Sequence, residues 1–311
     1  MPPPPPLQPQ LLPLTTGPRL ILYAQTHHTP SGTPISLLPL LTNPTGVTHV
    51  IVAAIHLNEG PGNITLNDHH PDDKRFDQLW AEVRWLQGAG VKVLGMLGAR
   101  PPHHPLRLLS RLRADFGSSF LLTLAPTATA LLPGLPHLSG FSYFELELAA
   151  SSLISWYNTQ FYCGWGDAAQ TAWYDAIMAA GWDPGRVVLG VVTNPGNGAG
   201  HVCIDGRVNS SRISEAGEER RGGFGDVLRI LWARYPGFGG VMGWEYFNAG
   251  GGEVPPLAPH QWVQAVGQVV PWPGEDVEML VGLGFGRQQA VAALNITEGN
   301  VEMAAGLLFG D

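Results

Sequence analysis

The sequence has few of the features that mark several large classes of protein. Only 2 of its 311 residues are cysteines, which is too few for a disulfide framework. It has no unbroken apolar run of about 18 residues, the length that spans a membrane, so we expect no membrane partner. The net charge is −8, with 17 basic and 25 acidic residues. A nucleic-acid partner is therefore not expected, since binding phosphates needs a basic surface.

The start of the chain also lacks the pattern of a secretory signal. Met1 is followed by five prolines, where a signal would have a basic start and a continuous apolar stretch. We therefore expect an intracellular, cytoplasmic protein, and we expect the sequons at Asn63, Asn209 and Asn295 to be chance matches. Nothing in the sequence indicates a cofactor.

The chain does contain a regular alternation of apolar and amphipathic segments. Near-continuous apolar segments predict buried strands at 20–25, 48–56, 91–97, 120–126, 155–163, 186–193 and 239–244. Amphipathic segments predict helices at 72–88, 105–116, 168–180, 224–234 and 260–269. This order is typical of a parallel α/β protein, and its length suits a (β/α)8 TIM-type barrel that is short by one βα unit. A doubly wound sheet is the competing fold, although the glycine-rich loop at 196–200 is not a convincing phosphate-binding turn.

The composition changes twice along the chain, which predicts the domain organisation. Residues 1–17 are rich in proline and are expected to form a disordered tail. The barrel is expected over 18–270, a linker over 271–274, and a small three-helix bundle over 275–311.

One predicted strand carries polar groups on a buried face. In the segment 156–162, Asn158, Gln160 and Tyr162 occupy alternate positions and therefore share one face. Buried polar groups need partners, and amides and phenols beside aromatic rings are what a sugar-binding site requires. The alternative is a core strand whose polar groups are satisfied within the protein.

Other predicted strands end in a similar set of side chains, at the edge where a barrel carries its functional residues. They are Tyr23, Gln25, His27, His28, His56, Asn58, Thr193, Asn194, Trp244, Glu245 and Tyr246. This polar and aromatic set again has the character of a carbohydrate site. Adjacent histidines can hold zinc, but His27 and His28 are expected to point to opposite faces of a strand, so no metal site is predicted.

These strand ends resemble the barrel of glycoside hydrolase family 18, the family of chitinases and endo-β-N-acetylglucosaminidases. The resemblance covers roughly residues 18–270 and depends on Gln160–Phe161–Tyr162, on the closing strand 240–244, and on the order of units. It implies cleavage of β-linkages next to N-acetylglucosamine, with a glutamic acid as proton donor and the substrate's acetamide as nucleophile. It also implies that Tyr162 contacts the acetamide and that Trp244 stacks on the sugar. Gln160 would line the same subsite, and Tyr23, Gln25, Asn158 and Glu245 complete the expected substrate-binding set.

The catalytic acid of that family is missing from this sequence. The family carries Asp-x-x-Asp-x-Asp-x-Glu on its fourth strand, and the pattern does not occur here. Only Ala99–His104 separates the third predicted strand from the next helix, whereas a parallel crossover needs about a dozen residues. Glu145 and Glu147 lie two apart and would face one side if 141–148 were a strand, but a solvated edge is the preferred interpretation.

Three hypotheses about function follow. The first is a chitinase-type hydrolase that lacks its acid because of a skipped exon or a faulty gene model. The second is a non-catalytic adaptor that links N-acetylglucosamine glycans, from chitin or N-glycans, to ubiquitin. The third is an unrelated barrel enzyme that uses the histidine-bearing strand ends.

The carboxyl-terminal bundle resembles a ubiquitin-associated domain. The matching residues are Leu283–Gly284–Phe285, Ala290, Ala293–Leu294, Gly299–Asn300–Val301–Glu302 and Ala304–Ala305. Helices are predicted over 275–282, 287–294 and 298–309, with Thr297 as the N-cap of the third. The resemblance implies a ubiquitin-binding patch of Leu283, Gly284, Phe285, Leu307 and Leu308. The alternative is that the helices dock on the barrel as a cap.

Overall fold

The computed structural model describes residues 18–60, 62–98, 105–205, 223–235, 237–269, 274–297 and 300–310. The proline-rich tail, the segment 99–104, the sequon at Asn209, the linker residues 271–273 and Gly299 lie outside the described residues. Among the residues that are described, no helix is long and apolar enough to cross a membrane.

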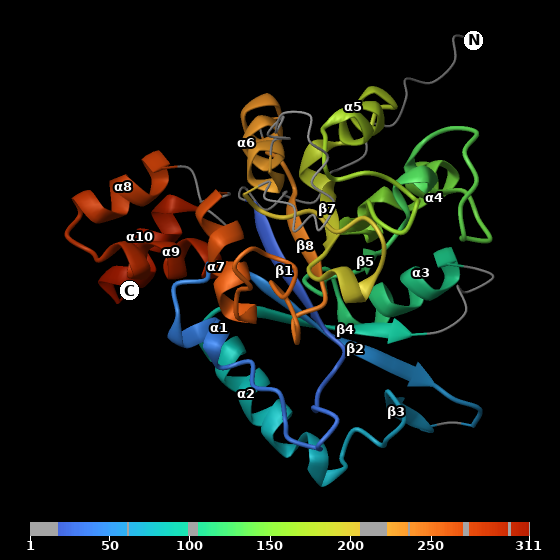
Figure 1. Ribbon diagram of the computed structural model, residues 1–311, viewed down its shortest axis with the longest axis horizontal. Helices are drawn as coiled ribbons and strands as arrows, with labels where there is room; N and C mark the ends of the chain where they lie inside the picture. The colour runs from blue at the N-terminus through green and yellow to red at the C-terminus, as the bar shows by residue number, and fades with distance from the viewer. Residues whose placement is uncertain are drawn as a thin grey trace, which may run out of the picture.

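A curled parallel sheet forms the centre of the larger domain (Figure 1). Its strands are β1 (Arg19–Ala24), β2 (His49–Leu57), β4 (Lys92–Gly98), β5 (Thr123–Leu124), β6 (Trp156–Gln160), β7 (Val187–Val192) and β8 (Gly240–Trp244). They pair in parallel in the order β4-β2-β1-β8-β7-β6-β5. A short strand, β3 (Ile64–Leu66), pairs antiparallel with the end of β2. The predicted α/β fold of TIM type is therefore confirmed.

The sheet does not close into a full barrel over the part of the chain that is described. Here β4 pairs in parallel only with β2, and β5 pairs only with β6. The unpaired edges of β4 and β5 therefore define an open seam. In chain order β4 is the third parallel strand and β5 the next one, so the seam falls where an eight-stranded barrel has its fourth strand. The predicted shortage of one βα unit agrees with this arrangement.

Helices cover the outside of the sheet. They are α1 (Pro39–Thr42), α2 (Asp77–Gly88), α3 (Pro105–Phe116), α4 (Tyr143–Ala150), α5 (Ala172–Ala179), α6 (Phe224–Arg234) and α7 (Pro259–Val269). In α2, Leu79, Val83 and Leu86 recur at helical spacing and are buried against the outer core. A 3₁₀ turn precedes α2, and Asp73 caps it by accepting a 2.9 Å hydrogen bond from the Arg75 amide.

Alternation along the strands divides their side chains between two cores. In β1, Leu20, Leu22 and Ala24 pack outward with the helices, whereas Ile21 and Tyr23 point into the barrel. The inner core also contains Ile51, Ala53, Ala54, Trp156, Val188 and Met242. A site built on the inner face is therefore surrounded by aromatic and aliphatic side chains.

Three expectations about secondary structure are corrected. The segment 141–148, considered as a strand, lies mostly in α4, because Ser142 caps the helix by accepting a hydrogen bond from the Glu145 amide at 3.2 Å. The predicted strand 120–126 contracts to the two residues of β5, which lie at the open seam. Asn300, not Thr297, caps the last helix, and the Thr297 hydroxyl donates back to the Ala293 carbonyl.

The carboxyl-terminal bundle has a small core of its own. Its helices are α8 (Gly274–Gly282), α9 (Arg287–Ile296) and α10 (Val301–Phe309), shown in red in Figure 1. Its buried residues are Val277, Leu280, Ala290, Ala293, Leu294 and Ala304. Because this cluster is separate from both barrel cores, the bundle is a second packing unit.

Candidate functional site

Asn158 links two strands through the interior of the barrel. Its side chain is fully buried, and its Oδ1 accepts a hydrogen bond from Trp156 Nε1 at 2.8 Å. Its Nδ2 donates to the Tyr23 hydroxyl at 3.1 Å. Asn158 is therefore satisfied within the protein, and it acts on the site by holding Tyr23.

Tyr23 in turn contacts the aromatic residue that ends β8. The centroids of the Tyr23 and Trp244 rings are 5.4 Å apart, and the rings are tilted by 57°. This is the spacing of a favourable aromatic pair. Tyr23 is buried and Trp244 is half-buried, so the indole is the more accessible ring.

Tyr162 follows β6 and lies in the same electrostatic environment as Tyr23. Burial raises the pKa of the Tyr162 phenol far above its usual value, and the nearby Tyr23 phenol adds to the effect. Burial also raises the pKa of Tyr23 to about 12, against a smaller lowering by the Asn158 hydrogen bond. Both phenols are therefore neutral at physiological pH and can donate O–H hydrogen bonds.

Gln160 is held toward the neighbouring strand. Its Nε2 donates to the Ala125 carbonyl at 2.8 Å, and the side chain is half-buried. Its amide nitrogen is thus engaged at the end of β5, while Asn158 and Tyr162 associate with Tyr23. The expected polar face is divided between these two directions.

Glu245 joins the ends of β1 and β8. Its buried carboxylate accepts hydrogen bonds from the Gln25 amide at 3.0 Å and from the Thr26 amide and hydroxyl, both at 2.8 Å. Gln25 therefore lies beside Glu245 through its main chain. A carboxylate with these three donors orients the neighbouring loops and is not placed as a free acid.

Asn67 also holds this edge and was missed by the sequence reasoning. Its Nδ2 donates to the Gln25 carbonyl at 2.8 Å, and its Oδ1 accepts from the Ala54 amide at 3.0 Å. Asn67 has a φ of 51°, a left-handed conformation that asparagine tolerates better than most residues. An asparagine in a turn after a short strand was the available signal.

The adjacent histidines lie beyond the end of β1 and both pack against the Phe76 ring, so the expectation that they point to opposite faces of a strand is wrong. They hydrogen-bond to different carbonyls. His27 Nε2 bonds the Ala53 carbonyl at 2.9 Å, and burial lowers the pKa of His27 to about 4. His28 Nε2 bonds the Arg75 carbonyl at 3.0 Å. Within the described part of the chain, no group of three or more His, Cys, Asp or Glu side chains could hold a metal ion.

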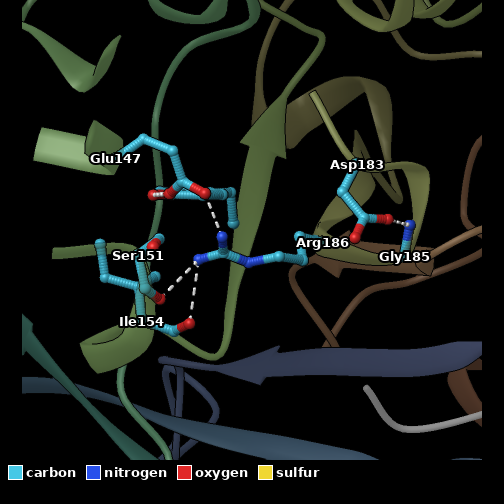
Figure 2. A network of polar contacts seen from close by, with 7 residues as sticks. Glu147, Ser151, Ile154, Asp183, Gly185 and Arg186 are labelled. Carbon is cyan, nitrogen blue, oxygen red and sulfur yellow. Dashed lines mark hydrogen bonds and ion pairs between the residues drawn. The ribbon is translucent and has the colours of Figure 1, made fainter. Parts of the chain in front are cut away.

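The glutamates considered as substitute acids both lie in α4. Glu145 is exposed, whereas Glu147 pairs with the guanidinium of Arg186 (Figure 2). Glu147 also accepts a hydrogen bond from the Tyr157 hydroxyl. Arg186 also donates to the carbonyls of Ser151 and Ile154, at 3.1 Å and 3.0 Å. Arg186 immediately precedes β7, at the end of the sheet opposite Trp244. The expected solvated edge is therefore wrong for Glu147, which belongs to a structural ion pair.

The carboxyl-terminal bundle presents apolar side chains to solvent. Leu283 and Leu307 are 48% and 44% exposed. Gly284 has a φ of +99°, which glycine adopts without strain, and the Phe285 ring packs edge-on against Phe309 with centroids 4.9 Å apart. Leu308 instead packs against the small core of the bundle. Of the predicted patch, Leu283 and Leu307 are therefore exposed to solvent, whereas Leu308 packs against the core of the bundle.

Comparisons with known proteins agree with this architecture. Residues 275–308 match the family model of the UBA/TS-N domain. Chitinase ChiC from Aspergillus fumigatus is 43% identical, with 79% of this chain and 96% of that chain covered and a TM-score of 0.67. A fungal endo-β-N-acetylglucosaminidase from glycosyl hydrolase family 18 is 38% identical, with 81% and 98% covered and a TM-score of 0.68. A search of curated proteins found no match. With this identity over nearly the whole length of two solved enzymes, the chain belongs to glycosyl hydrolase family 18, and its barrel is followed by a UBA domain.

Proposed function

We propose that the barrel binds β-linked N-acetylglucosamine glycans without cleaving them, and that the UBA domain binds ubiquitin. The observation that carries the first part is the open seam between β4 and β5, at the place where the resemblance to family 18 implies an acid-bearing fourth strand. Three residues at the carboxyl ends of β1, β6 and β8 support a glycan subsite, since Tyr23 packs against Trp244 and its phenol influences that of Tyr162. Neutral phenols donate to an acetamide, and an accessible indole covers an apolar sugar face.

The test separates binding from turnover. The full chain is titrated with chitotriose, and release of a fluorophore from a chitobiose glycoside is followed in parallel. We expect saturable binding and no release above a blank. Robust release by the purified chain would overturn the non-catalytic proposal.

Two site variants and one matched control locate the binding. Tyr162→Phe removes a single hydroxyl, and Trp244→Ala removes the indole, so both should weaken chitotriose binding. Trp85→Ala is the control, because Trp85 is 56% exposed on α2 and touches no site residue described above. Unchanged binding by both site variants would show that Tyr162 and Trp244 do not form the glycan site.

The choice of glycan follows from the two enzyme relatives. One is a chitinase and the other an endo-β-N-acetylglucosaminidase, so chito-oligosaccharides and N-glycan cores are the ligands to compare. Both present an N-acetylglucosamine acetamide to the phenols. Competition between chitotriose and an N-glycan core for one site would identify the preferred ligand.

Ubiquitin binding is tested on the exposed leucines and Phe285. We expect the full chain to bind ubiquitin, and we expect Leu307→Ala and Phe285→Ala to weaken this binding. Phe116→Ala on α3, which removes a ring that is 57% exposed, is the matched control. Since ubiquitin is intracellular, this partner would also support an intracellular location.

A docking role for the bundle is the second candidate, favoured by one contact. Gly90, between α2 and β4, lies against Ile296, since a Cβ at Gly90 would be 2.4 Å from Ile296 Cγ1. The two roles are compatible, because Leu283 and Leu307 remain exposed. Release of the bundle is expected for Ile296→Ala, which removes the contact and leaves Gly90, with its φ of +86°, unchanged. It would be seen as faster cleavage near residue 270 by a protease.

A further inference from the structure

The peptide segment that carries Trp244 is held from the β1 side. The Glu245 carboxylate bonds Gln25 and Thr26, and the Tyr246 amide donates to the Tyr23 carbonyl at 2.9 Å. These contacts fix the residues that follow Trp244. They do not touch the Trp244 carbonyl.

The Trp244 carbonyl is held from the β7 side. It accepts hydrogen bonds from the Thr193 amide at 2.8 Å and from Asn197 Nδ2 at 3.2 Å. The Thr193 hydroxyl donates to the next carbonyl, that of Glu245, at 2.6 Å. Asn197 is thus the side chain that reaches the peptide of the stacking residue from the loop after β7.

Asn197 is itself held by a reciprocal amide pair. Its Nδ2 donates to Asn248 Oδ1 at 2.9 Å, and Asn248 Nδ2 donates to Asn197 Oδ1 at 2.8 Å. Asn194 Nδ2 donates to the Asn248 carbonyl at 2.8 Å, and so ties the same two loops. Two carboxamides can each donate one hydrogen bond and accept one in such a pair. A carboxylate in either place could not donate.

We propose that Asn197, held by Asn248, is a positioning residue that sets Trp244 for stacking on the sugar. The inference rests on the proposed role of Trp244 in glycan binding. The loops after β7 and β8 carry the two asparagines, so the pair couples the orientation of the indole to the packing of two loops. A shift of the Trp244 peptide would move the ring relative to Tyr23, its neighbour at 5.4 Å.

The two asparagines offer a matched pair of variants. Asn197→Asp removes the donor to Asn248, to the Trp244 carbonyl and to the Thr193 hydroxyl oxygen. Asn248→Asp also breaks the reciprocal pair, because residue 248 can no longer donate. It leaves Asn197 Nδ2 able to donate both to the side-chain oxygen of residue 248 and to the Trp244 carbonyl. We therefore expect an asymmetry in chitotriose affinity, with Asn197→Asp weaker by about tenfold and Asn248→Asp by only about threefold.

A spectroscopic readout separates positioning from general loss of structure. The indole N–H resonance of Trp244 is assigned by its absence in Trp244→Phe. Asn197→Asp should shift this resonance in the free protein, and Asn248→Asp should move it less. Asn43→Asp is the control, since Asn43 Nδ2 also donates to a main-chain carbonyl, that of Pro39, far from the site.

The outcomes are distinct. Equal weakening by the two variants with an unmoved Trp244 resonance would overturn the proposal, as would an Asn197→Asp protein that binds like the parent. Asn197→Ser removes the same donor without adding charge, and it gives the answer if the aspartate variant does not fold. Unweakened binding by Trp244→Ala would instead refute the proposed glycan subsite, while the resonance shift would still report whether Asn197 positions the indole.

Discussion

The Glu147 carboxylate pairs with the guanidinium of Arg186 at the foot of β7 (Figure 2). Only 5% of the Arg186 side chain is exposed, against 28% for Glu147. The same carboxylate accepts a hydrogen bond from the Tyr157 hydroxyl, so α4 is tied both to β6 and to the turn that leads into β7. These contacts lie at the end of the sheet opposite Tyr23, Tyr162 and Trp244. We therefore expect them to stabilise the fold and not to affect glycan binding.

Glu147→Gln should destabilise the protein without altering glycan binding. The substitution leaves the buried guanidinium without its counter-charge, and the expected loss is about 2 kcal/mol, reduced from the fully buried case by the partial exposure of Glu147. Urea unfolding of the full chain measures it. Asp115→Asn breaks an exposed pair with Arg111 and should leave the unfolding midpoint in place. Equal effects of the two variants would contradict the structural role.

Asn158→Ala should affect stability and binding together. It removes the acceptor of Trp156 Nε1 and the donor to Tyr23, both inside the barrel. An unsatisfied buried donor costs roughly 1–3 kcal/mol, so urea unfolding should show a loss in this range. Chitotriose affinity should also fall, because the Tyr23 phenol loses its support. If the variant is destabilised but binds chitotriose normally, Asn158 does not support the binding site.

Glu253 should make the protein less stable as the pH rises. Burial raises the pKa of Glu253 from 4.5 to about 7, against a smaller lowering by hydrogen bonds from the Ile204 amide. Between these values the folded chain keeps a proton that the unfolded chain releases. The free energy of unfolding therefore falls across this window, by up to roughly 3 kcal/mol, and is level above it. Glu253→Gln should remove this fall from stability curves measured between about pH 4 and 8; an unchanged curve would refute the assignment.

His27 should have the opposite effect on the pH dependence of stability. Burial lowers the pKa of His27 from 6.5 to about 4, so the unfolded chain takes up a proton first as the pH falls. The stabilisation is complete above about pH 6.5 and is lost as the pH falls toward 4. His27→Gln should thus resist acid better, relative to its own stability at neutral pH. Acid sensitivity equal to that of the parent would point to other groups.

The strands and the bundle were predictable because their signals are local. The apolar runs that became β1, β7 and β8 and the helices α3 and α6 could be found from periodicity alone. Tyr23 and Trp244 were expected at the same edge of the sheet because the ends of parallel strands meet there, but their ring contact appears only in the structure.

What was missed depends on partners far apart in the sequence. Gln160 alternates correctly with Asn158, yet its side-chain amide donates to the carbonyl of Ala125, the residue that follows β5. The reciprocal pair of Asn197 and Asn248 joins loops 51 residues apart, which no local pattern can indicate. Glu147 looked like part of a strand because two glutamates alternate, but a cap at Ser142 makes the segment helical.

The open seam gives the sheet a beginning and an end, which a closed barrel does not have. Each inner strand has two parallel neighbours, whereas β4 and β5 each have one in the described structure. Opening can therefore start at either edge and proceed strand by strand toward β1 and β8. Amide hydrogen exchange should record this as a gradient, fastest in β5 and β4 and slowest at the pairing of Leu20 with Val241 in the middle of the sheet.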